Sequence, residues 1–205
     1  MGDLVTSFVR ACLAVVVLGA MPAIAAAQTP TPGPPPPTTS NLWIAVGGGS
    51  TTVRGHCQFC EEETDYLHAG SVLADFGYRA TRRADVGAEV LWTSATNAAG
   101  DRVKTTFLTA VAQFRPWASA GFFIRGGAGM ALVRNWLINL DTPTVQKALA
   151  VHIGTGWAWR RESRIGAEFL AMQHAAALGD FATSDGPVEN VLGNYWTIGA
   201  ALVIR

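Results

Sequence analysis

The chain has 205 residues with 15 basic and 15 acidic side chains, so no net charge favours binding to nucleic acid. Hydrophobic residues make up 49% of it, yet after the first 27 residues no apolar run reaches the roughly twenty residues that a membrane-spanning helix needs. Glycine (22 residues) and tryptophan (7 residues) are abundant, which is typical of a β-barrel with aromatic side chains at the membrane interfaces.

The first 40 residues predict an exported chain with a spacer. Arg10 precedes the apolar run Ala11–Ala20, and Ala25–Ala27 provides small residues for cleavage, so residues 1–27 are interpreted as a signal peptide. Residues 28–40 are rich in proline, which lacks a backbone donor and fixes φ. They therefore predict an extended linker rather than a helix or strand.

Eight segments with alternating apolar and small or polar residues follow, and this period of two predicts β-strands. In Ser119–Val133, for example, Phe122, Ile124 and Met130 fall on one face, whereas Phe123 and Arg125 fall on the other. The fourth segment alternates poorly, so its facing stays open. The predicted strands are Asn41–Thr51, Tyr66–Arg79, Ala84–Ser94, Val103–Arg115, Ser119–Val133, Gln146–Arg160, Arg164–Gln173 and Val191–Ile204.

The connections between these segments alternate in length. Those after the second, fourth and sixth segments are short, whereas the others are longer and polar, including Thr52–Asp65, Arg134–Val145 and His174–Asn190. This pattern predicts an all-β fold for residues 41–205, an eight-stranded antiparallel up-and-down transmembrane β-barrel. An even strand count places both termini at the short-turn end, which we expect to face the periplasm.

The glycine-rich strands GFFIRGGAGMALV and NYWTIGAALVIR resemble those of the small eight-stranded outer-membrane β-barrel domain family. The resemblance covers Asn41–Arg205, nearly the whole mature chain, and concerns architecture. It implies location in the outer membrane of a Gram-negative type bacterium, with outer-membrane lipid and the barrel assembly machinery as partners. One departure is the chain end, Val203–Arg205, where many such barrels have an aromatic residue.

If the apolar faces meet lipid, several charged side chains point into a narrow interior, where they must pair. We expect a network of Glu89, Arg125 and Glu168, with His152 or Arg164 as a further member. Asp75 also falls on the inward face. The interpretation is a structural role, and a gated path for ions or protons is the alternative.

The first long connection carries His56, Cys57 and Cys60, followed by acidic residues. In an exported protein the two cysteines predict a disulfide. A metal site formed by these three residues is the alternative. A thioredoxin-like redox pair is excluded because no such unit surrounds it.

Two further groups of side chains lie near the predicted strand ends. The tryptophans are interpreted as an interfacial girdle. They are Trp43, Trp92, Trp117, Trp136, Trp157, Trp159 and Trp196. Arginines gather at the short turns, where we expect solvated charges in reach of anionic inner-leaflet headgroups. They are Arg79, Arg82, Arg83, Arg115, Arg160, Arg161 and Arg164.

Two alternatives to a plain membrane barrel are considered. The segment around His174 is similar to one near the end of outer-membrane lipid A deacylases, but Ala176 stands where that family has its nucleophilic serine. We therefore expect His174 to be a rim or loop residue. A lipocalin-like periplasmic binder would also have eight strands, with the apolar faces turned inward.

The sequence thus predicts a non-enzymatic outer-membrane barrel without a cofactor. Its role would be structural, or an interaction with a surface ligand or envelope partner through the long loops.

Overall fold

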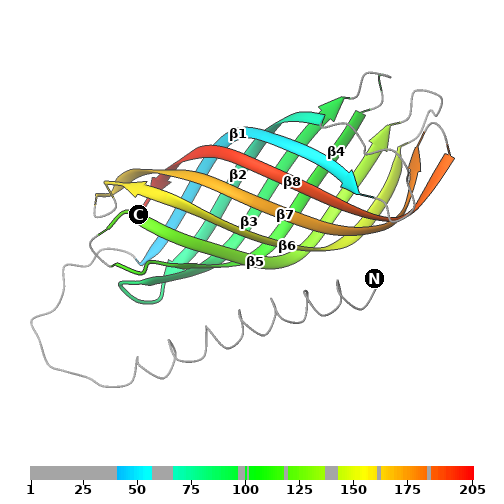
Figure 1. The fold of residues 1–205 in the computed structure, drawn as a ribbon. Helices are drawn as coiled ribbons and strands as arrows, with labels where there is room; N and C mark the ends of the chain where they lie inside the picture. The colour runs from blue at the N-terminus through cyan, green and yellow to red at the C-terminus, as the bar shows by residue number, and fades with distance from the viewer. Residues whose placement is uncertain are drawn as a thin grey trace, which may run out of the picture.

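The chain, described by a computed structural model, forms one closed barrel of eight strands (Figure 1). The structure describes residues 41–56, 67–96, 100, 102–117, 120–136, 143–160, 163–183 and 186–205, without the side chains of 55, 56 and 180–190. The strands are β1 (Leu42–His56), β2 (Leu67–Arg79), β3 (Ala84–Thr96), β4 (Arg102–Phe114), β5 (Phe122–Trp136), β6 (Thr144–Trp159), β7 (Ile165–Thr183) and β8 (Gly186–Ile204).

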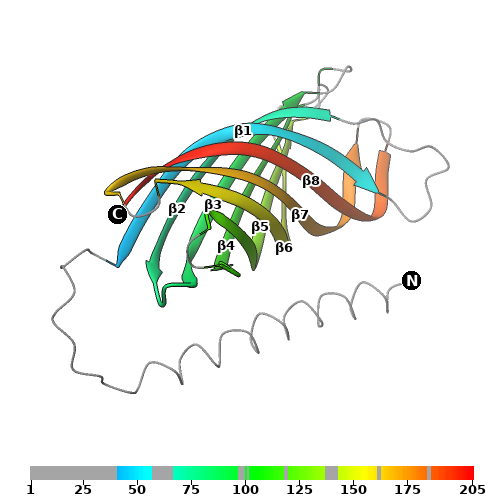
Figure 2. The ribbon, with the colours of Figure 1, turned by 60° about the vertical axis from the view of Figure 1, so that its left-hand side comes forward.

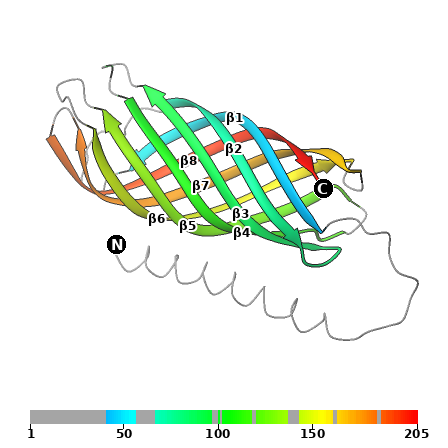
Figure 3. The ribbon, with the colours of Figure 1, turned by 180° about the vertical axis from the view of Figure 1, so that it is seen from behind.

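Each strand pairs antiparallel with the next, which confirms the predicted up-and-down order. The barrel closes where β1 pairs with β8, from Ile44 opposite Ile204 to His56 opposite Leu192. The beginning of β1 and the end of β8 therefore lie at the same end, which we call the terminal end. The opposite end is called the loop end (Figures 1 and 3).

The alternation of side chains between the two sides of the wall follows from the period of two in the sequence. In β5, Phe123 and Arg125 are buried inside, whereas Ile124 and Met130 are exposed outside. The facing of β4, left open by its sequence, is now clear. Its inward residues include Phe107, and its outward face carries Leu108 and Phe114.

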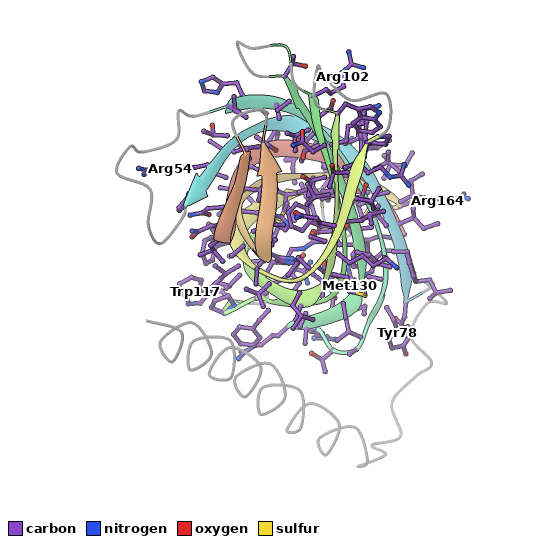
Figure 4. All side chains as sticks on the ribbon, turned by 90° about the vertical axis from the view of Figure 1, so that its right-hand side faces the viewer. Arg54, Tyr78, Arg102, Trp117, Met130 and Arg164 are labelled. Atoms are coloured by element: carbon purple, nitrogen blue, oxygen red, sulfur yellow. The ribbon has the colours of Figure 1, made fainter. Side chains whose placement is uncertain are left out.

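The outside of the barrel is apolar. Ile198 and Leu149 each have 71% of their surface exposed, which water would oppose but lipid tails favour. Figure 4 looks along the barrel and shows this outer layer of side chains, with Tyr78 and Trp117 projecting outward. Among the described residues, no helix is long and apolar enough to cross a bilayer. The chain crosses the membrane with its strands, and an inward-facing apolar cavity of the lipocalin kind is excluded.

The interior is filled with side chains. Phe107, Phe123 and Leu91 are fully buried in it, and Met172 and Tyr195 pack against the same cluster. A cavity lined by residues of β1, β2, β3, β7 and β8 has a volume of about 10 Å³, which is room for a single water molecule at most. Within the described part of the chain, the interior therefore holds a packed core rather than an open channel.

One predicted loop is wrong. Residues 174–190, expected as a connection, belong almost entirely to β7 and β8, which leaves only residues 184 and 185 between the strands. The register shifts on either side of Gly179, whose φ is +67°. Glycine adopts this conformation without steric cost, and the resulting bulges bend the hairpin at the loop end (Figure 2). The predicted strand ended at Gln173, before these bulges, because alanines at 175, 176 and 177 on both faces remove the contrast between apolar and polar positions.

A charge placed on the outer face should report the depth of the surrounding lipid. Ile153 lies near the middle of β6, and Val145 lies on the same face close to the loop end. We expect Ile153→Arg to lower the free energy of unfolding by about 2–4 kcal/mol and Val145→Arg by about 1 kcal/mol or less. Urea unfolding in lipid vesicles, followed by tryptophan fluorescence, measures both. Equal effects at the two positions would contradict the transmembrane placement.

Candidate functional site in the barrel interior

A layer of ion pairs crosses the middle of the barrel. Asp75 of β2 lies directly opposite Glu89 of β3, and both carboxylates point inward. Arg125 of β5 reaches them from across the interior, with Nη2 at 2.9 Å from Asp75 Oδ1 and 2.7 Å from Glu89 Oε2. All three side chains are almost completely buried. A single guanidinium thus holds two carboxylates, because an unpaired charge in this medium would be costly.

Two histidines complete this layer on the opposite wall. His152 of β6 and His174 of β7 are register partners, and their ring centroids lie 4.7 Å apart. Both approach the free oxygen of Glu89: His174 Nε2 lies 3.0 Å and His152 Nδ1 lies 3.4 Å from Oε1. Thr109, the partner of Glu89 on β4, lies 3.4 Å from His152 Nδ1. We call Glu89, His152, His174 and Thr109 the histidine cluster.

A second set of ion pairs lies nearer the terminal end. Arg115 Nη1 donates to Asp85 Oδ2 at 2.6 Å, and both side chains are buried. Glu168 Oε1 lies 3.2 Å from Arg205 Nη2 and 3.9 Å from Arg115 Nη2. Arg79 adds a longer contact of 3.7 Å to Asp85. This set links β2, β3 and β7 with the residues that follow β4 and β8. It therefore connects the end of β8, at the junction where β1 and β8 close the barrel, to strands on the other side of the interior.

Towards the loop end, two interior hydrogen bonds between described side chains join uncharged groups. Thr51 and Thr197 share a hydrogen bond of 2.9 Å across the β1–β8 seam, and Thr105 and Tyr195 share one of 3.1 Å. The Tyr195 ring packs edge-on against Phe107, with centroids 4.9 Å apart. In each of these two pairs, one hydroxyl donates a hydrogen bond to the other, and no charged group takes part.

The structure brings Glu89 and Arg125 together, with His152 beside them, as the sequence predicted for the interior. Glu168 was expected in the same network, but it lies in the second set of ion pairs with Arg115 and Arg205. Arg164 is exposed at the terminal end rather than inside. The spacing of these charges along the barrel axis was not readable from the sequence, because it depends on the register between strands.

The structure corrects the predicted position of His174. The sequence reading placed it in a rim or loop, but it lies within β7 and is fully buried in the interior. Residues 168, 170, 172 and 174 share one face, so extending the alternation by one residue would have found it. Ala176 also faces inward and is buried. A deacylase-like arrangement at these two positions therefore has no contact with lipid on the outside.

The structure also corrects the predicted positions of Arg115 and Trp43. Arg115 was expected as a solvated turn charge, but it follows β4 directly and turns into the interior. Trp43 was assigned to the interfacial girdle, but it is inward-facing and 8% exposed. The ring of Trp43 occupies the space beside Gly77, where a Cβ would lie 2.5 Å from Trp43 Cζ2.

The other tryptophans face outward at two levels. Trp117, Trp157 and Trp159 lie at the terminal end, each more than half exposed. Trp92, Trp136 and Trp196 lie nearer the loop end, and the Lys104 ammonium lies 5.0 Å from the Trp136 ring centroid. Two aromatic levels of this kind are typical of the two interfaces of a bilayer.

The predicted disulfide or metal site of the first connection lies outside the described residues. Cys57 and Cys60 are not described, and His56 is described only as the last residue of β1. The pairing of these cysteines stays a prediction.

Comparison with known proteins agrees with the fold. Neisserial surface protein A has a TM-score of 0.53 and 12% sequence identity, covering 81% of this chain and 97% of that chain. Ail, the attachment invasion locus protein of Yersinia pestis, has a TM-score of 0.52 and 12% identity, covering 81% of this chain and all 100% of that chain. No family model and no curated protein sequence matches the chain.

The chain therefore has the fold of the small eight-stranded outer membrane β-barrels. Its apolar exterior, two tryptophan levels and charged interior are those of a barrel that spans the outer membrane. At 12% identity the likeness concerns the fold, so the function must be argued from the residues of this chain.

Removing one partner of the central ion pairs should destabilise the barrel strongly. Replacing Arg125 by methionine leaves two carboxylates buried without their cation, so we expect the free energy of unfolding to fall by about 3–5 kcal/mol. Arg164→Met at the exposed terminal end is the matched control and should change it by about 0.5 kcal/mol or less. Urea titrations in lipid vesicles compare the two, and similar values for both variants would refute the assigned role of Arg125.

Proposed function

We propose that the protein is a non-conducting barrel that presents its loop end at the cell surface, where it interacts with other molecules. The observation that carries the proposal is the packed interior, in which the ion pairs and the aromatic core fill the lumen from wall to wall. A barrel of eight strands has room only for side chains. Without an open lumen, the parts of the molecule left for interaction are its outer face and its loops.

A cluster of basic residues on the outer face supports this proposal. Lys104 of β4 and Arg134 of β5 are direct register partners and both point outward, as do Arg102 and Lys147 at the same end. We call these four residues the basic patch. Like charges directly opposite each other on a sheet are destabilising. Among the described residues of β3 to β6, no acidic side chain faces outward to offset them.

The chemistry of this patch fits the phosphate groups of outer-leaflet lipid. Lys104 lies over the rings of Trp136 and Trp92, at 5.0 and 6.0 Å from their centroids. Tryptophans mark the level of the headgroups, so the basic patch lies where anionic phosphates of the lipid are found. Bound phosphates would relieve the repulsion between Lys104 and Arg134. The barrel would then be held in the membrane at a fixed depth and orientation, with its loops projecting.

Planar-bilayer recordings test the non-conducting interior. We expect purified, folded protein to give no stepwise conductance in salt solution, because the packed core leaves no continuous water path. Discrete, reproducible openings of the wild-type barrel would overturn this part of the proposal. Heat-modifiable mobility in detergent gels verifies that the inserted protein is folded.

Lipid retention tests the basic patch. The triple variant Arg102→Gln/Arg134→Gln/Lys147→Gln should retain far less phosphorylated outer-leaflet lipid through purification in mild detergent. At about 1 kcal/mol for each charge, the expected loss of affinity is on the order of 100-fold. The variant Arg82→Gln/Arg83→Gln/Arg164→Gln at the terminal end is the matched control, because those side chains are also exposed. An unchanged content of phosphorylated outer-leaflet lipid in the first variant would contradict the role of the patch.

A further inference from the structure

We propose that the histidine cluster is a binding site for a divalent transition-metal ion of the zinc type, held inside the barrel. Two imidazoles and a carboxylate are a donor set that suits zinc and neighbouring metals. The donors come from three strands, Glu89 from β3, His152 from β6 and His174 from β7. One ligand atom from each residue lies within 4.8 Å of the other two.

The distances are close to those of a metal site. With metal–ligand bonds of about 2.0–2.1 Å, tetrahedral ligand atoms lie about 3.3 Å apart. Glu89 Oε1 lies 3.0 Å from His174 Nε2 and 3.4 Å from His152 Nδ1. Two of the three distances between ligand atoms are therefore already close to the tetrahedral value. One ring nitrogen of each histidine lies within 4.8 Å of a ring nitrogen of the other, so a side-chain movement of at most about 1.5 Å brings such a pair to the required spacing.

The charge of the central layer favours a cation at this point. In this layer two carboxylates, those of Asp75 and Glu89, face a single guanidinium, that of Arg125. A buried carboxylate oxygen that faces no cation is a favourable position for one. Glu89 Oε1 is such an oxygen, because Arg125 binds Oε2 and leaves Oε1 directed at His152 and His174.

The surroundings fix the three donors in place. Arg125 acts on Glu89 as outer partners act on ligating carboxylates in metal sites, by holding one oxygen and orienting the other. Gly127 gives His152 its room, since a Cβ at that position would lie 2.6 Å from His152 Cε1. Phe107 packs against the His174 ring, with centroids 4.8 Å apart. Both rings are therefore held towards Glu89.

A fourth donor is also available. Thr109 Oγ1 lies 3.4 Å from His152 Nδ1 and 3.5 Å from Glu89 Oε1, so its hydroxyl faces the same point. It can ligate the ion directly or hold a water molecule that does. Glu89 is then the one anionic residue among the four donors.

The sequence permits a clean experiment, because the chain has only four histidines, His56, His68, His152 and His174. The variant His56→Gln/Cys57→Ser/Cys60→Ser/His68→Gln removes the loop ligands and the outward-facing His68. In this background every imidazole ligand must be His152 or His174. The protein is purified without a histidine tag, folded in detergent with Co²⁺ or Zn²⁺, separated from free metal by gel filtration, and analysed for metal content.

We expect about one ion for each folded background chain, with His152 and His174 showing paramagnetically shifted imidazole signals in proton NMR of the cobalt form. Adding His152→Gln/His174→Gln should lower the retained metal at least tenfold. If that variant does not fold, Glu89→Gln, which keeps the shape of the side chain, provides the comparison. Heat-modifiable mobility verifies folding in each case.

Three results would overturn the metal site. They are a folded background protein that retains no metal, cobalt without shifted imidazole signals, and metal content that is unchanged in a folded His152/His174 or Glu89 variant. The outcome is independent of the basic patch, which lies on the outer face of the barrel.

Discussion

The pairing of charges inside a closed, narrow wall is the constraint on which the rest of this structure depends. Eight strands enclose too little space for hydration, so every ionic side chain that points inward must meet a partner of opposite charge. Arg125 therefore spans the lumen to two carboxylates, and Arg115 turns back from the end of β4 to Asp85. Glycines such as Gly127 are needed for the same reason, because large inward rings on one strand leave no room for a side chain on the next.

The two ends of the barrel differ in the side chains that fill their interiors. The interior of the terminal end is ionic, with Arg115, Arg205 and Glu168 linking the chain terminus to the opposite wall. Towards the loop end, the described interior residues include hydroxyls and aromatic rings such as Tyr195, which contact one another. Its positive charges stand on the outside instead, in the basic patch. Arginines stand outside at the terminal end as well, among them Arg82 and Arg164, so the difference between the two ends lies in the interior.

Much of the fold was readable from the sequence, because a period of two fixes which side chains share a face. The prediction that Glu89, Arg125 and His152 face inward follows from this period alone. What could not be read is the position of each residue along the axis, which the register between strands decides. Glu168 was therefore expected beside Glu89 and Arg125, whereas it pairs with Arg115 and Arg205. His174 and Arg115 were missed for a related reason, since both lie at or beyond the predicted end of a strand.

The seam between β1 and β8 has a consequence for how the molecule is made. It joins residues near the two ends of the described chain, Ile44 and Ile204, so it is among the contacts of greatest sequence separation. Contacts of this kind form late and slowly, because a long loop must first be closed. The central layer draws on β2, β3, β5, β6 and β7, and its charges are shielded from water on every side only once the seam is shut. During assembly these charges remain hydrated, and the lumen dries as the final step of closure.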